Sequence, residues 1–318
     1  MPGRQTIHIT FIHGISNKPT VDTLTTMWKD ALATDLRGAG DDIDLDTLGI
    51  TTSMIYWADV LYGDPLSDSV LQVLERLESD PAGAADGLAG PDEDWRDELS
   101  GEERRFVEGI ALKTLADVAE PVLVDDVHVQ NGLERIPIPW VIKRPLMGYL
   151  LRDVHHYLFN KTFSPRPGVS YKVQEEIRSR VLSALNAVTA DKHIVMSHSM
   201  GTVIIYDCLK RLQDCPAIDG LMTIGSPLGL DEVQDKLSPQ WTRENGFPEK
   251  LGGFWINVYD PLDVVAMFDG NLANDFKKSG AQKIEVIRES NQGAWRHDIS
   301  KYLRMPLLRS ALRKLIEE

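Results

Sequence analysis

The segment from Asp191 to Tyr206 constrains the fold of this chain more than any other. It begins with a short apolar run, Ile194-Val195-Met196, of the kind that forms a buried strand. A sharp turn at Ser197-His198-Ser199-Met200-Gly201 follows, and the chain then continues as an apolar, helix-like segment. Small residues suit such a corner because the backbones of the strand and the helix crowd together there. Ser199 is therefore expected on a tight bend, with its hydroxyl exposed above the edge of a sheet.

Strand and helix patterns alternate along most of the chain. Besides the segment above, strand patterns cover residues 6–12, 51–59, 220–225, 254–259 and 283–287. Helical patterns cover residues 21–36, residues 169–190 and a closing region from Tyr302 to Leu315. Strands separated by helices predict a mainly parallel, doubly wound α/β sheet, and we expect one domain over residues 1–318.

Residues 61–168 do not keep this rhythm and are expected to form a helical, lid-like insertion. Helices are expected over residues 70–77 and 106–118, a solvated loop over 80–91, and a break at Pro137, Pro139 and Pro145. The insertion also carries an apolar cluster that could pack on the core, line a pocket for an acyl chain or touch lipid. Its members are Ile136, Ile138, Trp140, Val141, Ile142, Leu146, Met147, Tyr149 and Leu150.

Composition narrows the class of protein. A net charge of −14 over 318 residues argues against a nucleic-acid binder, which needs basic surface to neutralise phosphates. No apolar run approaches the roughly 18–20 residues that span a bilayer. The N-terminus passes into a strand pattern without an apolar signal-peptide region, and this predicts a cytoplasmic protein. Cys208 and Cys215 are expected to be buried, idle thiols, and the adjacent His155 and His156 cannot share a helix face to bind a metal.

Three polar groups follow successive strands in a meaningful order. Ser199 follows the first of these strands, Asp260 and Asp263 follow the strand over residues 254–259, and His297 follows the last strand. A neutral imidazole can remove the proton of a serine hydroxyl during attack on a carbonyl carbon, and a carboxylate on the other ring nitrogen fixes the tautomer. The order serine, acid, histidine is typical of α/β hydrolases. Together these groups favour a nucleophile elbow at Ser199 over an ordinary turn.

At this point the chain resembles a known family, the α/β-hydrolase-fold serine esterases and lipases, and in particular a bacterial branch similar to GPI-inositol deacylases. Four groups of residues carry the resemblance over residues 1–60 and 170–318, while the insertion is not covered. They are His13-Gly14, His198-Ser199-Met200-Gly201, the segment Thr223-Ile224-Gly225-Ser226-Pro227-Leu228, and the segment from Asn257 to Val265 with His297 and Tyr302.

The resemblance implies a role for each matching position. Ser199 would be the nucleophile, His297 the general base and Asp263 the acid, although Val264 stands where the family usually has proline. Asp260 is the alternative acid. The oxyanion would be bound by the backbone N–H of Met200 together with that of Gly14 or Ile15. The exposed His198 and the nearby His13 have no position in the triad, and His198 is expected to order the elbow.

The implied activity is hydrolysis of carboxylic esters through an acyl-serine intermediate, with no metal or cofactor. The substrate would be a small-molecule or lipid ester, and transient contact with a membrane surface is compatible with the apolar cluster. Two alternatives remain open from the sequence. The same triad could serve an acyltransferase or a thioesterase, or the hydrolase fold could be a non-catalytic binding or signalling module.

Overall fold

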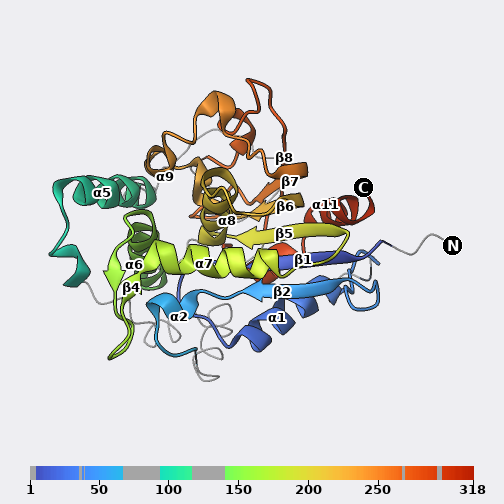
Figure 1. Ribbon diagram of the computed structural model, residues 1–318, viewed down its shortest axis with the longest axis horizontal. Helices are drawn as coiled ribbons and strands as arrows, with labels where there is room; N and C mark the ends of the chain where they lie inside the picture. The colour runs from blue at the N-terminus through green and yellow to red at the C-terminus, as the bar shows by residue number, and fades with distance from the viewer. Residues whose placement is uncertain are drawn as a thin grey trace, which may run out of the picture.

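A computed structural model describes residues 5–35, 38, 40–66, 94–116, 140–266, 269–291 and 296–318, without the side chains of 114–116 and 140–146. Its centre is a sheet of six parallel strands in the order β2-β1-β5-β6-β7-β8 (Figure 1). The strands are β1 (Ile7–Ile12), β2 (Thr51–Ile55), β5 (Lys192–His198), β6 (Ile218–Ile224), β7 (Leu251–Tyr259) and β8 (Ile284–Arg288). A small antiparallel pair, β3 (Thr162–Phe163) and β4 (Tyr171–Lys172), lies outside it. The predicted doubly wound, parallel α/β sheet is confirmed.

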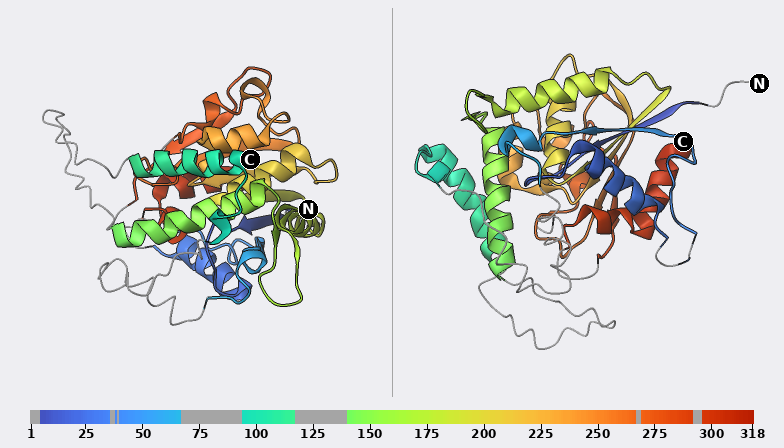
Figure 2. Two further views of the ribbon diagram at one scale, coloured as in Figure 1. Left: turned by 90° about the vertical axis from the view of Figure 1, so that its left-hand side faces the viewer. Right: turned by 90° about the horizontal axis from the view of Figure 1, so that it is seen from below.

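Helices cover both faces of the sheet (Figure 2). One face packs against α1 (Val21–Ala33), α10 (Ile299–Leu303) and α11 (Pro306–Glu317), and the other against α7 (Val173–Asn186) and α8 (Met200–Arg211). The alternation of β1 explains this division, because Ile9 and Phe11 belong to the core on the α1 side and Ile12 to the core on the other side.

The strand order places a switch point between β1 and β5. From β1 the chain adds β2 on one side, and after the insertion it returns to add β5, β6, β7 and β8 on the other. Connections from two such neighbouring strands leave in opposite directions, which opens a crevice at their carboxyl ends. Ser199 follows β5 and His13 follows β1, so both lie at this point.

The insertion contributes two long helices among the described residues, α5 (Gly101–Ala116) and α6 (Trp140–Leu158). The prediction of a helix near residues 106–118 is confirmed, whereas the predicted break at Pro145 is wrong because α6 continues through it. In the apolar cluster, Met147 and Leu150 are buried in the core and Tyr149 is half-buried against it. Residues 70–77, the loop 80–91, Pro137 and Pro139 lie outside the described residues.

Several element boundaries differ from the prediction. The second strand ends at Ile55, and residues 58–61 form a short helix, α2 (Ala58–Leu61), because the backbone N–H of Trp57 bonds to His13 instead of to a strand. The closing region is two helices because Pro306 begins α11 and holds Met305 extended. The helix expected over 169–190 is the shorter α7, and a further helix, α9 (Asp231–Leu237), follows β6.

Two further predictions concern membrane-spanning segments and the cysteines. Within the described ranges, every helix is too short or too polar to cross a bilayer. Cys208 and Cys215 are both buried and free, as predicted, and burial raises the pKa of each thiol. Burial of this kind keeps thiols protonated and unreactive.

Gly201 yields a prediction about stability. A Cβ added at Gly201 would lie 2.7 Å from the carbonyl oxygens of both Ile12 and His13, which are backbone atoms that cannot move aside cheaply. We expect Gly201→Ala to lower the free energy of unfolding by about 1–3 kcal/mol in urea titrations. Gly252→Ala is the matched control, because its added Cβ would meet only the Ile218 carbonyl oxygen at 3.7 Å. Equal stability of the two variants would contradict the packing of α8 on β1.

Candidate active site

Ser199 occupies a strained corner between β5 and α8. Its backbone has φ 54° and ψ −129°, a region that costs a residue other than glycine about 1–3 kcal/mol. Neighbouring bonds hold it there: the Ser199 N–H donates to the Ile224 carbonyl at 2.9 Å, and the Thr202 hydroxyl donates to the Ser199 carbonyl at 2.7 Å. Ser197 is another small residue at this corner, and its hydroxyl donates to the Met222 carbonyl at 3.3 Å. The tight bend expected from the sequence is present.

The serine hydroxyl is buried, although the sequence predicts that it is exposed. Ser199 has 0% of its surface exposed, and its Oγ has no hydrogen-bond partner among the described residues. The segment that follows β1 covers part of the Ser199 side chain. A Cβ added at Gly14 would lie 2.5 Å from the Cβ of Ser199 and 3.1 Å from its Oγ, so only a glycine allows this approach.

His13 fixes the segment that runs beside Ser199. The Trp57 backbone N–H donates to His13 Nε2 at 3.0 Å, and the Trp57 indole N–H donates to the His13 carbonyl at 2.9 Å. Because Nε2 accepts a bond, Nδ1 carries the ring proton and donates it to the Gly14 carbonyl at 2.9 Å. Burial, helped by the charge of Lys18, lowers the pKa of His13 to about 3. His13 is therefore a neutral, structural histidine.

Asp153, from helix α6 of the insertion, holds the next part of this segment. Its buried carboxylate accepts from the Ser16 N–H at 2.9 Å and from the Tyr62 hydroxyl at 2.7 Å, and it is paired with Arg152 at 3.0 Å. The Lys18 ammonium donates to the carbonyl of Ile15 and to the Ser16 hydroxyl. Burial lowers the pKa of Lys18 to about 8, opposed by the charges of Asp153 and Asp298. The insertion thus braces the segment beside Ser199.

His297 and Asp263 form a buried pair. His297 Nδ1 lies 2.7 Å from Asp263 Oδ2, and the two residues are 4% and 0% exposed. The other carboxylate oxygen, Oδ1, accepts from the Val265 N–H at 2.9 Å. Both residues lie in loops that follow neighbouring strands, since Asp263 comes after β7 and His297 after β8.

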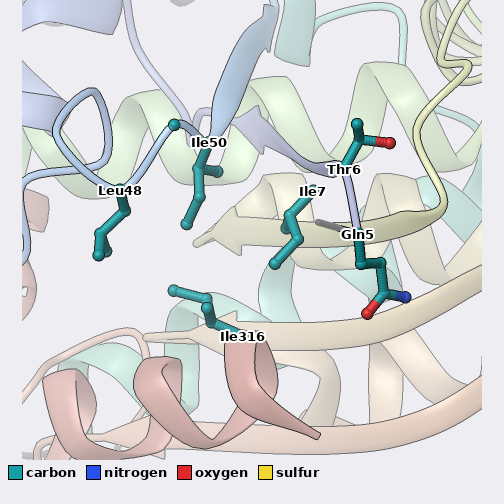
Figure 3. Close-up of a pocket in the computed structure, with 7 residues that line it drawn as sticks. Gln5, Thr6, Ile7, Leu48, Ile50 and Ile316 are labelled. Carbon is teal, nitrogen blue, oxygen red and sulfur yellow. The ribbon is translucent and has the colours of Figure 1, made fainter. Parts of the chain in front are cut away.

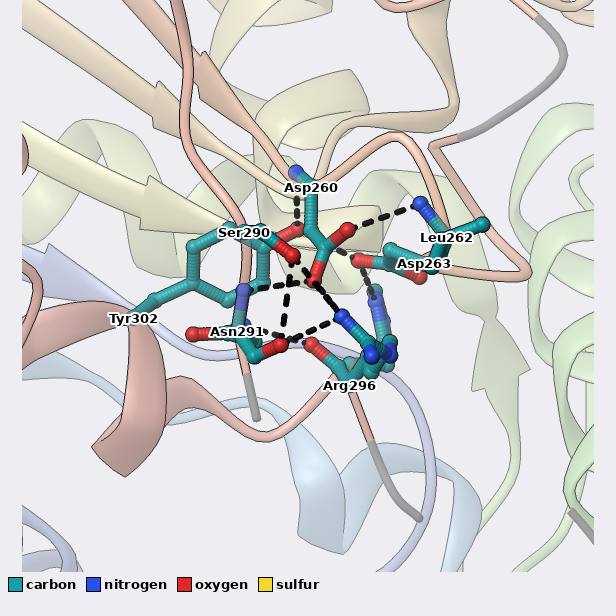
Figure 4. A network of polar contacts seen from close by, with 8 residues as sticks. Asp260, Leu262, Asp263, Ser290, Asn291, Arg296 and Tyr302 are labelled. Carbon is teal, nitrogen blue, oxygen red and sulfur yellow. Dashed lines mark hydrogen bonds and ion pairs between the residues drawn. The ribbon is translucent and has the colours of Figure 1, made fainter. Parts of the chain in front are cut away.

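Asp260, the alternative acid, turns to other partners (Figure 4). Its carboxylate accepts from the backbone N–H groups of Leu262 at 2.7 Å and Asn291 at 2.6 Å, and it pairs with Arg296 at 3.1 Å. Its two oxygens are thereby engaged with groups other than the His297 ring. Of the two candidate acids, the geometry pairs Asp263 with the histidine.

His198 connects the elbow to this pair. Its ring lies 4.6 Å from that of His297, between centroids, and it hydrogen-bonds to the backbone of His297. It is 7% exposed, so the prediction that it is exposed is wrong: the closing helices cover that face of the sheet. Burial, and then the proximity of His297, lowers the pKa of His198 well below its usual value. The neutral ring of His198, the residue before Ser199, therefore packs beside the ring of His297.

The two predicted oxyanion donors lie on either side of Ser199. Met200 is the first residue of α8, where helix geometry leaves a backbone N–H without an intrahelical acceptor. Gly14 and Ile15 belong to the segment that passes over the Ser199 side chain. Met200, Gly14 and Ile15 are all buried, so a developing negative charge there would be shielded from water.

The adjacent histidines of α6 make a structural cluster. His155 Nδ1 lies 3.2 Å from His156 Nδ1, so the two rings do meet, and His155 Nε2 lies 3.2 Å from Glu103 Oε1. Lys161 donates to the same glutamate oxygen at 2.8 Å. Burial lowers the pKa of His155 to about 4 and that of His156 to about 3. Over the described ranges no group of three or more His, Cys, Asp or Glu side chains is placed to hold a metal ion.

A hollow of about 250 Å³ lies at the amino ends of the strands, away from Ser199 (Figure 3). It is formed where β1 and β2 begin, whereas Ser199, Asp263 and His297 follow the ends of their strands. Its lining residues are Gln5, Thr6, Ile7, Leu48, Gly49, Ile50 and Ile316. The hollow is therefore separate from the candidate active site.

Three residues of this site were not assigned a role from the sequence. Asp153 braces the segment after β1, Arg296 holds Asp260, and Tyr302 donates to Asp263 at 2.7 Å. Asp153 and Arg152 lie between the apolar residues Leu151 and Val154, and charged residues in such a place are a signal of a buried polar contact. Nothing in the sequence indicates that Tyr302 or Arg296 contacts these acids, because both contacts depend on how the last loop folds back.

Comparisons with known proteins add little to this geometry. No family model matches the chain, and no curated protein matches it. Among solved structures, the crystal structure of an uncharacterized protein from Pseudomonas aeruginosa is similar at 10% sequence identity with a TM-score of 0.30. The likeness covers 90% of this chain and 40% of that one, so this chain spans less than half of that protein's length. At such a TM-score the likeness carries no argument about fold or function.

The neutral state of His13 yields a prediction about pH. Its pKa is about 3 in the folded protein, whereas an unfolded histidine has its usual value of 6.5. Below pH 6.5 His13 is protonated in the unfolded chain but stays neutral in the folded chain, so the free energy of unfolding falls as pH falls. At pH 5.5 this loss is about 1.4 kcal/mol for one such histidine.

The variant His13→Gln tests this, because a glutamine oxygen can accept the Trp57 N–H without titrating. Urea titrations at pH 7.5 and pH 5.5 should show that the variant loses about 1.4 kcal/mol less stability than the wild type between the two. The same loss in both proteins would mean that His13 is not held neutral.

Proposed function

We propose that this chain is a serine hydrolase with the α/β-hydrolase fold that cleaves carboxylic esters. The observation that carries the proposal is the buried His297–Asp263 pair at 2.7 Å, whose imidazole lies 4.6 Å from the ring of His198, the neighbour of a serine in a strained elbow. Strain at a residue other than glycine persists only where the surroundings enforce it, and such positions are concentrated at functional sites. The parallel order of the strands supports the fold assignment.

In the proposed reaction, His297 accepts the proton of Ser199 through Nε2 because Nδ1 is bonded to Asp263. The Ser199 oxygen attacks the ester carbonyl carbon, and the oxyanion takes hydrogen bonds from the N–H of Met200 and that of Gly14 or Ile15. Collapse of this intermediate expels the alcohol, which receives its proton from His297. Water, deprotonated by His297, then attacks the acyl-serine, and the acid is released as His297 returns the proton to the Ser199 oxygen. These steps use only groups of the chain and water.

The proposed substrate is a small-molecule or lipid ester. Helix α6 of the insertion supports this, because Asp153 braces the segment beside Ser199 from outside the sheet and Met147 and Leu150 add apolar surface to the adjoining core. We place helix α6 over the carboxyl ends of the strands as part of a cap on the site. The strongly acidic net charge of −14 disfavours a nucleic-acid substrate.

The first test is the variant Ser199→Ala. Without the hydroxyl no acyl-enzyme can form, so turnover of p-nitrophenyl esters should fall by roughly 10⁴-fold or more while the circular dichroism spectrum is unchanged. A small fluorophosphonate should label the wild type at Ser199 and leave the variant unlabelled. Since Ser199 is buried, labelling also tests whether a reagent reaches it. Full activity of Ser199→Ala would refute the proposal.

The two aspartates should separate activity from stability. Asp263→Asn is expected to lower kcat by about 10³- to 10⁴-fold, because it disturbs the histidine tautomer, and to lower the free energy of unfolding by only about 1–3 kcal/mol, because one of its acceptor oxygens is lost. Asp260→Asn leaves Arg296 buried without its charge partner and should lower the free energy of unfolding by about 3–5 kcal/mol. Its residual folded fraction should retain most of its activity per active site, as titrated with fluorophosphonate. The reverse pattern would make Asp260 the acid.

A further inference from the structure

The Tyr302 hydroxyl lies between the two aspartates (Figure 4). It donates to Asp263 Oδ2 at 2.7 Å and accepts from the backbone N–H of Asp260 at 2.9 Å. Tyr302 has 0% of its surface exposed, so no water competes for either bond. A hydroxyl has one proton to donate, and here that proton is committed to Asp263.

The oxygen that Tyr302 contacts is the one that contacts the histidine. Asp263 Oδ2 lies 2.7 Å from His297 Nδ1 and 2.7 Å from the Tyr302 hydroxyl. The other oxygen accepts from the Val265 N–H at 2.9 Å. With three donors the carboxylate cannot rotate, and its negative charge is shared between the imidazole and the hydroxyl.

Tyr302 also joins Asp263 to the loop that carries His297. Asp260 is paired with Arg296, the residue before His297, and the Asn291 side chain donates to the Arg296 carbonyl at 2.7 Å. The position of Asp260 is therefore set by that loop, and the bond from its N–H sets the position of the Tyr302 hydroxyl. Asp263 and His297 are thus held in fixed positions by the same set of contacts.

We propose that Tyr302 is a positioning residue of the acid–base pair: its hydroxyl fixes the orientation of Asp263 and draws charge from the oxygen that faces His297. The proposal rests on the proposed hydrolase function for its catalytic consequence. Burial, and then the charge of Asp263, raises the pKa of Tyr302 well above its usual value, so the hydroxyl remains a donor over the working pH range.

Other titratable groups surround the pair and set the background for a pH measurement. His198 faces His297 from the end of β5 and is held neutral. Asp298, next to His297, caps α10 through the N–H groups of Ser300 and Lys301. Lys18 interacts electrostatically with both His198 and Asp298. Asp260, in the same loop as Asp263, is paired with Arg296. None of these contacts is removed when the Tyr302 hydroxyl alone is deleted.

The test compares Tyr302→Phe with Tyr157→Phe. Tyr157 is a matched control because its hydroxyl also donates to a fully buried carboxylate, Asp207, at 2.7 Å, but this pair ties α6 to α7 and α8 and does not touch the candidate triad. Both variants lose one buried hydrogen bond, so both should show a lower Tm. In Tyr302→Phe alone, kcat should fall by about 10- to 100-fold with little change in KM.

Two readouts distinguish positioning from simple destabilisation. Without the hydroxyl more charge stays on Asp263 Oδ2 and stabilises the imidazolium, so the acid limb of the kcat/KM profile of Tyr302→Phe should move to higher pH by about half a unit to one unit. The proton resonance of His297 Nδ1–H should move downfield, because Oδ2 becomes a stronger acceptor. Tyr157→Phe should leave both at their wild-type positions.

If the Tyr302→Phe profile and resonance match those of Tyr157→Phe, the positioning role is overturned. The resonance does not require turnover, so it separates this proposal from the proposed function. A wild type that neither hydrolyses esters nor reacts with fluorophosphonate would overturn the hydrolase function, whereas a shifted resonance in Tyr302→Phe would still support the coupling between Tyr302 and His297.

Discussion

The contact on which the site depends is the close approach of the carboxyl end of β1 to the corner between β5 and α8. Gly201 lies against the carbonyl oxygens of Ile12 and His13, and Gly14 lies against the side chain of Ser199. Both approaches are shorter than any Cβ would allow, so a glycine on each side of the crossing lets two backbones meet. The strain at Ser199, about 1–3 kcal/mol, is offset in part by the hydrogen bonds that its backbone makes with Ile224 and Thr202.

Around this crossing, buried carboxylates join segments that are distant in the sequence. Asp153, Asp260 and Asp263 are each fully buried, and each is held by several donors from the backbone, an arginine or a tyrosine. Such a group is tolerated in the interior only when its charge is compensated, so each aspartate enforces the arrangement of the segments that supply its donors. These three aspartates therefore fix helix α6, the loop after β7 and the loop that carries His297 relative to one another.

The histidines near Ser199 illustrate how environment decides the role of one side chain. His13 is committed to Trp57 and to its own loop, and His198 is buried against His297, so both are held neutral. His297 is the ring that is bonded to a carboxylate, Asp263. Of the three, it alone has the arrangement that supports a proton transfer in both directions. Figure 4 shows the polar groups that surround Asp260 and Asp263.

The sequence by itself determined the parallel sheet and the order of Ser199, Asp263 and His297, because strand periodicity is local and the ends of parallel strands share one edge. It left open the choice between Asp260 and Asp263, which lie in the same loop, whereas the tertiary structure pairs Asp263 with His297 and Asp260 with Arg296. Tertiary contacts alone gave Tyr302 its place and buried Ser199 and His198. Each of these depends on contacts between distant segments, which no local pattern encodes.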